Sequence, residues 1–248
     1  MATLAVEQVA ATLEGLEETI IHKLIDRAQF RRNLTVYRPG QSGFQGDAVS
    51  SLFEIRLRQH EVMDAEFGRF HVPEERPFTS PLPASRRLVS VPENILMIDD
   101  YDSVNLTARI QSDYLSFVSQ LCADGDDLQY GSSVEHDVQV LQAVSRRIHF
   151  GAMYVAEVKL RSNPTEYRRL IEANDRIGLV SLLTRPEAET RILERVREKV
   201  AYIQARVNTS VRSLVDADVV LKFYRDTVIP LTKDGEVLYL LNRRNPRD

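Results

Sequence analysis

Apolar residues recur at intervals of three and four along most of this chain, and this spacing constrains its fold more than any other feature. Such spacing places apolar side chains on one face of a helix, whereas a half-buried strand needs strict alternation. The 248 residues include only 10 glycines and 10 prolines, few for an all-β protein of many tight turns. The sequence predicts an all-α fold: a single-domain helical bundle of about eight to twelve helices over residues 1–248.

The expected helices have recognisable ends. They cover 6–30, 47–67, 93–98, 103–122, 132–161, 164–173, 186–206, a segment that ends at residue 229, and 231–244. Asp47 is the predicted N-cap of the second, and Ser132, followed three residues later by a glutamate, has the spacing of a capping box. Asp216 or Asp218 is expected to begin the helix that ends at 229, and Pro230 to separate it from the last one. Five prolines between the second and third helices argue against regular structure there.

Composition excludes several classes of protein. The net charge of −4 disfavours a strongly basic nucleic-acid binder, and no apolar run is long enough to cross a membrane. The first residues carry acids and no basic region, unlike a signal peptide. Cys122 is the single cysteine, which excludes an internal disulfide framework and a CxxC metal site. We expect a cytoplasmic protein with no metal, no nucleic-acid partner and no membrane partner.

Positive charge is concentrated in one part of the chain. Residues 141–212 hold 14 basic and 8 acidic side chains, although the whole chain is acidic. This excess falls in predicted helices, and a local positive field suits a small anionic ligand better than a polyanion. Solvated helix faces are the alternative explanation.

Familiar catalytic and binding motifs are missing. The segment GQSGFQG lacks the GK[ST] ending of a phosphate loop. His149 stands in mid-helix without a second histidine or cysteine at ligand spacing, so a packing role is favoured over metal binding. What remains is a set of charged or hydroxyl residues within apolar helical patterns, which either lie on the surface or line a polar cavity inside the bundle: Arg146, Arg147, Lys159, Glu189, Thr232 and Glu236.

At these residues a family resemblance becomes specific. The segment LQAVSRRIHFGAMYVAEVK resembles the central helix of the eukaryotic-type, all-helical chorismate mutases. ETIIHKLIDRAQF resembles that family's first helix, PEAETRILERV a later helix, and KFYRDTVIPLTKDGEVLYLLNRR its C-terminal helix pair. The resemblance implies a helical homodimer that converts chorismate, a small dicarboxylate, to prephenate in aromatic amino acid biosynthesis, without a cofactor.

The resemblance also implies roles for individual side chains. The rearrangement is pericyclic, so the site must hold a dicarboxylate in its reactive conformation and stabilise charge on the ether oxygen. Arg147 would bind one carboxylate, with help from Thr232. Lys159 and a protonated Glu236 would reach the ether oxygen from opposite sides, and Glu189 would accept the substrate hydroxyl.

Two departures concern the cations. The family has an arginine in its first helix for the second carboxylate, but Ala10 stands there. Arg185 replaces the asparagine that the family has one turn before the helical glutamate. We hypothesise that Arg185 supplies the missing cation and binds substrate.

A third departure concerns helical register. The family separates its helix arginine and lysine by eleven residues, whereas Arg147 and Lys159 are twelve apart. One extra residue would turn Lys159 by about 100° in a regular helix. A π-bulge near 151–154 would restore the register, and without it Val158 would take the lysine position.

Regulation and alternative functions follow from the same resemblance. Relatives bind aromatic amino acids at the dimer interface, and Arg69, Gly131 and Ser132 match that effector region, whereas Gly68 stands where a second arginine is usual. One alternative is a repurposed enzyme of this fold that acts on another anionic substrate in a specialised pathway. The other is a non-catalytic helical protein that binds or regulates a partner.

Overall fold

The structure is a computed structural model, and it describes residues 6–90 and 95–244. Over these residues the chain forms helices α1 to α10 and no strand, so the predicted all-α fold is confirmed. None of the helices in this part of the chain is long and apolar enough to cross a membrane.

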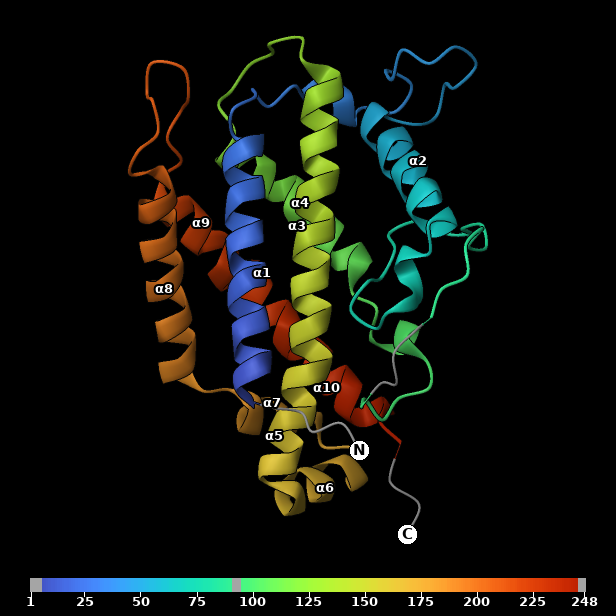
Figure 1. Ribbon diagram of the computed structural model, residues 1–248, viewed down its shortest axis with the longest axis vertical. Coiled ribbons are helices and arrows are strands. Elements are labelled where there is room, and N and C mark those ends of the chain that lie inside the picture. Colours follow the sequence, from blue (N-terminus) through green and yellow to red (C-terminus); the bar gives the residue numbers. More distant parts are fainter. Residues whose placement is uncertain (1–5, 91–94, 245–248) are drawn as a thin grey trace.

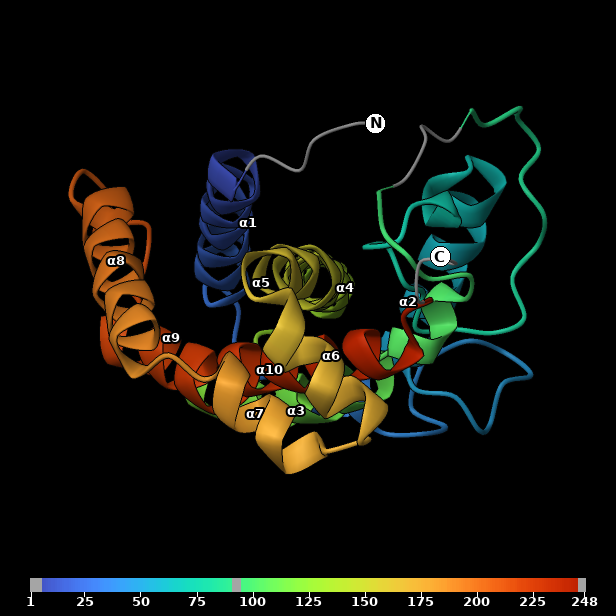
Figure 2. The same ribbon diagram turned by 90° about the horizontal axis from the view of Figure 1, so that it is seen from below.

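Two long helices form the centre of the bundle. α1 (Val6–Arg27) and α4 (Tyr130–Phe150) lie side by side, with α8 (Pro186–Gln204) beside α1 and α2 (Leu52–Glu66) beside α4 (Figure 1). α3 (Thr107–Leu121), α9 (Ala217–Phe223) and α10 (Ile229–Asn242) cross behind them (Figure 2). The facing stripes of α1 and α4 bury apolar residues fully, among them Ile20, Ile21, Leu24, Val138, Leu141 and Val144.

The central helix contains the wide turn that its spacing predicted. α4 passes through one π-helical turn, Gly151–Val155, into α5 (Ala156–Ser162). A π turn holds one more residue than an α turn, so the helix absorbs the extra residue without breaking. The predicted bulge near 151–154 is therefore confirmed.

A second π turn corrects the prediction at Pro230. The proline does not separate two helices: α9 runs through a π turn, Tyr224–Val228, directly into α10, and Pro230 lies in the first turn of α10. Proline has no N–H and its ring crowds the carbonyl four residues earlier. The wide turn just before Pro230 relieves both problems, so the helix continues.

Two predicted N-caps are wrong, and the helix expected from 103 begins at Thr107, after the separate 3-10 turn Tyr101–Val104. α2 begins at Leu52, not near Asp47, because Ser51 and Glu54 form a capping box there. The Asp47 carboxylate instead accepts the backbone N–H groups of Val49 and Ser50 in a turn. The second error concerns Ser132, which caps nothing, because α4 begins two residues earlier at Tyr130.

The remaining connections include one helix that was missed. α6 (Pro164–Glu172) was expected, but α7 (Arg176–Leu183) was not. α7 is short, contains Gly178 and lacks a clear polar face, and its start depends on the Asp175 side chain, which accepts the Gly178 N–H at 2.8 Å. The helix predicted at 93–98 lies partly outside the described residues, and 95–98 are not helical. Asp216 is the N-cap of α9, one of the two aspartates expected there.

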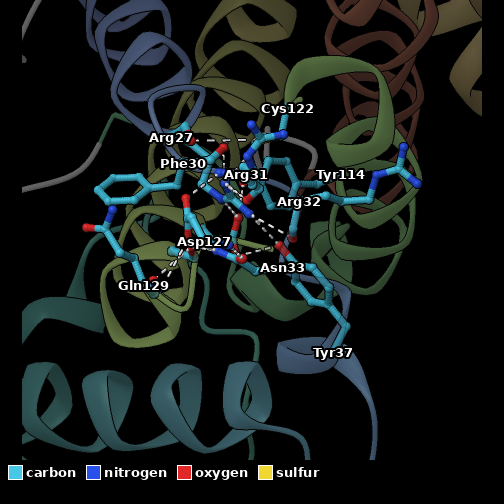
Figure 3. Close-up of polar contacts among 12 residues, drawn as sticks. Arg27, Phe30, Arg31, Arg32, Asn33, Tyr37, Tyr114, Cys122, Asp127 and Gln129 are labelled. Carbon is cyan, nitrogen blue, oxygen red and sulfur yellow. Dashed lines mark hydrogen bonds and ion pairs between the residues drawn. The ribbon is translucent and has the colours of Figure 1, made fainter. Parts of the chain in front are cut away.

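A buried polar network fixes the C-terminal end of α1 (Figure 3). The carboxylate of Asp137, on α4, is fully buried and accepts hydrogen bonds from Arg27 Nε, the Tyr37 hydroxyl and the Tyr114 hydroxyl, each at 2.6 Å. Arg27 also donates to the Cys122 sulfur at 3.1 Å. These contacts join α1, α3 and α4, and each buried charge has a partner, so removing one partner would leave the other charge uncompensated.

Tyr114→Phe is therefore expected to lower the free energy of unfolding by about 2 kcal/mol, since it removes a buried hydrogen bond to a charged group. Urea unfolding followed by circular dichroism measures this change. Tyr130→Phe is the matched control: its hydroxyl bonds Asp126 at 2.8 Å but is exposed, so a change within about 0.5 kcal/mol is expected. Equal losses in the two variants would contradict the assignment.

His149 is a packing residue, as its sequence context predicted. It is fully buried; its Nε2 accepts the Leu106 N–H at 3.0 Å, and its Nδ1 lies 2.8 Å from the Ser145 carbonyl oxygen. Burial lowers the pKa of His149 to about 4, so the ring is neutral and Nδ1 donates. The ring thereby satisfies a backbone N–H at the start of α3.

Candidate active site

A cavity of about 170 Å³ lies where α4 and α5 face α8 and α10, and α1 and α7 contribute one lining residue each. Its lining consists of Leu13, Arg147, Val155, Lys159, Leu183, Arg185, Ala188, Glu189, Ile192, Ile229, Thr232, Lys233 and Glu236. All six residues predicted for catalysis and substrate binding are among them. Segments far apart in the sequence therefore meet in one polar hollow with apolar walls, and the roles of the six stay predictions.

The π turn sets the register of two of these residues. Arg147 precedes the turn and Lys159 follows it, and both line the cavity although they are twelve residues apart. Val158, which would take the place of the lysine in an uninterrupted helix, does not line the cavity. The wide turn thus compensates for the extra residue.

Arg147 is a buried cation with an unsatisfied donor. Its side chain comes from α4 and is 3% exposed; one terminal nitrogen donates to the Thr232 hydroxyl at 3.2 Å, and its Nε is buried with no partner. Burial lowers the pKa of Arg147, although a guanidinium remains charged in proteins. Gly151 leaves it room, because a Cβ there would lie 2.9 Å from an Arg147 nitrogen and 2.8 Å from Thr232 Cγ2.

Lys159, which is half-buried, and the buried Glu236 form an ion pair on the wall of the cavity. Lys159 Nζ lies 3.0 Å from each oxygen of the Glu236 carboxyl group and also donates to the Leu183 carbonyl oxygen at 3.2 Å. Glu236 is 3% exposed, and burial raises its pKa against the lowering effect of Lys159. This carboxyl group is therefore closer to protonation than an ordinary glutamate.

A second ion pair includes a residue that the sequence reasoning missed. Lys233 Nζ lies 2.8 Å from Glu189 Oε1, and both residues line the cavity. Lys233 lies three residues before Glu236, so helical spacing could have placed it on the same face. The apolar lining residues were also missed, because at helical spacing they look like ordinary core positions.

The first helix contributes no charge to the cavity, whereas Arg185 contributes a cation. Ala10 is exposed and does not line the cavity; α1 contributes Leu13 instead, which carries no charge. Arg185 is exposed, lines the cavity at the start of α8 and makes no ion pair with any residue that the structure describes. The lining holds four cations and two carboxylates, so its charge favours a ligand with two negative charges.

The predicted effector residues do not meet within one chain. Arg69 is held by Asp64 and Gln142, each at 2.5 Å, and by Glu75. Gly131 and Ser132 are exposed at the start of α4, and Gln142 lies about 15 Å further along that helix. An effector site built from these residues therefore stays a prediction that needs a second chain.

Known proteins resemble this chain over nearly its whole length. It is 35% identical over 252 residues to a chorismate mutase of Schizosaccharomyces pombe, which covers 97% of this chain and 96% of the relative. A chorismate mutase 2 of Petunia hybrida is 36% identical, with 97% of this chain and 93% of the relative covered. No family model matches the chain.

Solved structures agree with the sequence comparison. A Candida albicans chorismate mutase in complex with L-Trp superposes with a TM-score of 0.88 and is 33% identical, with 97% of this chain and 92% of that chain covered. The chloroplast chorismate mutase of Zea mays gives a TM-score of 0.86 at 32% identity, with 96% and 94% covered. With a similar fold, similar sequence and nearly complete coverage, this chain belongs to the eukaryotic, all-helical chorismate mutase family.

Proposed function

We propose that this cavity binds chorismate and catalyses its rearrangement to prephenate. The chain is a chorismate mutase-like isomerase, and this reaction is a step of aromatic amino acid biosynthesis. A carbon–oxygen bond of the ether breaks while a carbon–carbon bond forms, so no nucleophile is needed. Catalysis then depends on holding the folded conformer of the substrate and on stabilising charge at the ether oxygen.

One observation carries the proposal: two arginines of the cavity are free to bind carboxylates. Lys159 and Lys233 are each paired with a glutamate, whereas Arg147 and Arg185 make no ion pair among the described residues. A planar guanidinium matches a carboxylate with two parallel hydrogen bonds. We assign one substrate carboxylate to Arg147, assisted by Thr232, and the other to Arg185.

The ion pair of Lys159 and Glu236 supplies the donors for the ether oxygen. Lys159 Nζ and the Glu236 carboxyl group are 3.0 Å apart, so one substrate atom can receive hydrogen bonds from both when Glu236 is protonated. These donors are fixed in a largely apolar cavity, where they stabilise developing charge more strongly than water does. The Glu189 carboxylate accepts a hydrogen bond from the substrate hydroxyl once Lys233 releases this carboxylate.

The protonation of Glu236 predicts a pH dependence. Burial raises its pKa, so the donating form persists above the usual range of a glutamate and is lost as pH rises through the shifted value. We expect kcat/KM to fall tenfold per pH unit on that alkaline limb. Glu236→Gln keeps a neutral donor at this position, so its pH profile should be flat over the same range. A wild-type profile without an alkaline limb contradicts this role.

The activity itself is tested by the loss of chorismate absorbance with the purified protein. We expect wild-type turnover, about a tenfold loss in Arg185→Asn, and little change in Ala10→Arg, because Arg185 already binds the second carboxylate. An inert wild type that Ala10→Arg activates would contradict the relocated cation and indicate a decayed site.

A second candidate function is action on another anionic substrate. Leu13 favours it, since it is the residue that α1 contributes to the cavity lining and it carries no charge. An inert wild type that still binds small dicarboxylates in calorimetry would support this alternative. A wild type that neither turns over chorismate nor binds anions would leave the non-catalytic role.

We further propose a homodimer in the cytoplasm. Met63, in the last turn of α2, and Phe67, its C-cap residue, are 49% and 66% exposed, an apolar surface suited to a second copy. Light scattering should give twice the chain mass for the wild type and the chain mass for Phe67→Asp; a monomeric wild type contradicts the dimer. The location is supported by a maize relative named cytosolic, although a petunia relative is named chloroplastic.

A further inference from the structure

The two free arginines of the cavity differ sharply in their surroundings. Arg147 is 3% exposed, fixed by Thr232 and packed against Gly151. Arg185 is exposed and lies in the short connection between α7 and α8, as the N-cap residue of α8. Arg147 is therefore a rigid cation away from water, and Arg185 is a solvated cation at the mouth of the cavity.

This difference in burial gives the two contacts different energies. An ion pair away from water loses much binding energy when one partner becomes neutral, because the other charge stays buried and unpaired. An exposed pair is screened by water and salt and contributes little. The substrate carboxylate at Arg185 should therefore matter far less than the one at Arg147.

The lining residues that follow Arg185 along α8 are uncharged up to Ile192, apart from Glu189. α1 contributes Leu13, and no charged residue of α1 lines the cavity. Ala188 and Ile192, from the first turns of α8, add further alkyl surface. A ligand that carries an uncharged group at Arg185 therefore leaves no buried cation without a partner, because Arg185 is exposed.

We propose that this chain rearranges monoanionic substrates as well as the dianion: enolpyruvyl ethers of a cyclohexadiene that keep the carboxylate at Arg147 and carry a neutral ester or amide at Arg185. The proposal rests on the proposed function and names the substrate range of the same site. The same carbon–oxygen bond breaks and the same carbon–carbon bond forms, with no co-reactant and no net proton transfer. Arg185 thus selects for the second charge only weakly.

The two regioisomeric monomethyl esters of chorismate test this directly. For each ester and for chorismate we would measure kcat/KM after subtracting the uncatalysed rearrangement of the same compound. One ester should lie within about tenfold of chorismate, and the other, with its neutral group at Arg147, should fall at least about 100-fold. Two esters that both fall 100-fold would overturn the inference, as would two that both stay within tenfold. No turnover of chorismate itself would instead contradict the proposed function.

The variant Arg185→Gln tests whether Arg185 contacts the second substrate carboxylate at the mouth of the cavity. This variant should lower kcat/KM for chorismate to the level of the tolerated ester and leave the tolerated ester unchanged. Arg191→Gln is the matched control, since Arg191 is an exposed arginine of α8 that does not line the cavity; all three substrates should be unaffected. If Arg185→Gln lowers chorismate and the tolerated ester by the same factor, Arg185 does not contact the second carboxylate and the inference is wrong.

Discussion

Arg147→Gln is expected to lower kcat/KM for chorismate by about 1,000-fold without unfolding the protein. Arg147 is almost fully buried, and its Nε has no hydrogen-bond partner in the part of the chain that the structure describes. A substrate carboxylate would give this guanidinium its missing hydrogen-bond partner, and removing the guanidinium leaves the substrate charge unpaired in a largely apolar cavity. A loss of about 4 kcal/mol in transition-state binding corresponds to this change in rate.

The neighbouring arginine provides a control of the same chemistry. Arg146 is 48% exposed at its side chain and lies 3.5 Å from Glu75. Arg146→Gln should change kcat/KM by less than about threefold. Arg147→Lys keeps the charge but loses the planar pair of donors, so it should fall between the two. Steady-state kinetics and thermal unfolding on all three variants give the comparison; similar activities for Arg146→Gln and Arg147→Gln would refute the role of Arg147.

Periodicity predicted helices well and helix starts poorly, and α4 shows why. Ser132 and Glu135 have the spacing of a capping box, yet the helix begins at Tyr130. Asn33, from another segment, makes two hydrogen bonds with Asp127. Its side-chain Nδ2 donates to the Asp127 carboxylate at 2.8 Å, and the Asp127 backbone N–H donates to Asn33 Oδ1 at 3.0 Å. Asp127 in turn accepts the Gln129 N–H. This contact over 94 residues fixes the start of α4, and no local pattern records it.

The candidate site, too, was predictable from the sequence only in part. Residue types and family resemblance were enough to select Arg147, Lys159 and Glu236, because their chemistry suits a dianion. Their burial was not predictable, since it depends on charges from other helices. The charge that most opposes the lowered pKa of Arg147 is Glu17 on α1, which is fully buried and is held by Arg195 of α8 at 2.9 and 2.7 Å. Only the assembled bundle brings these helices together.

Deleting Tyr154 is expected to leave kcat/KM within about tenfold of wild type, whereas inserting one alanine after Tyr154 should lower it about 1,000-fold. A helix advances about 100° per residue, so Arg147 and Lys159 point the same way at a spacing of eleven residues and diverge at twelve. The π turn Gly151–Val155 absorbs the difference. Deletion converts it to an ordinary turn with both side chains in place. Insertion adds a residue that no second wide turn can absorb, and Lys159 turns away from Glu236.

Tyr154 is the residue to delete because it is less buried than Gly151, Ala152 and Met153, and because it does not line the cavity. Its ring stacks on Phe150 at 4.5 Å, so Tyr154→Ala is needed to separate loss of the ring from loss of the extra residue. Circular dichroism and unfolding in urea should show all three variants folded, and the activities then report only the direction of Lys159. If the deletion is as inactive as the insertion while Tyr154→Ala stays active, the wide turn is itself required by the site, because restoring the regular helix would then have displaced Lys159.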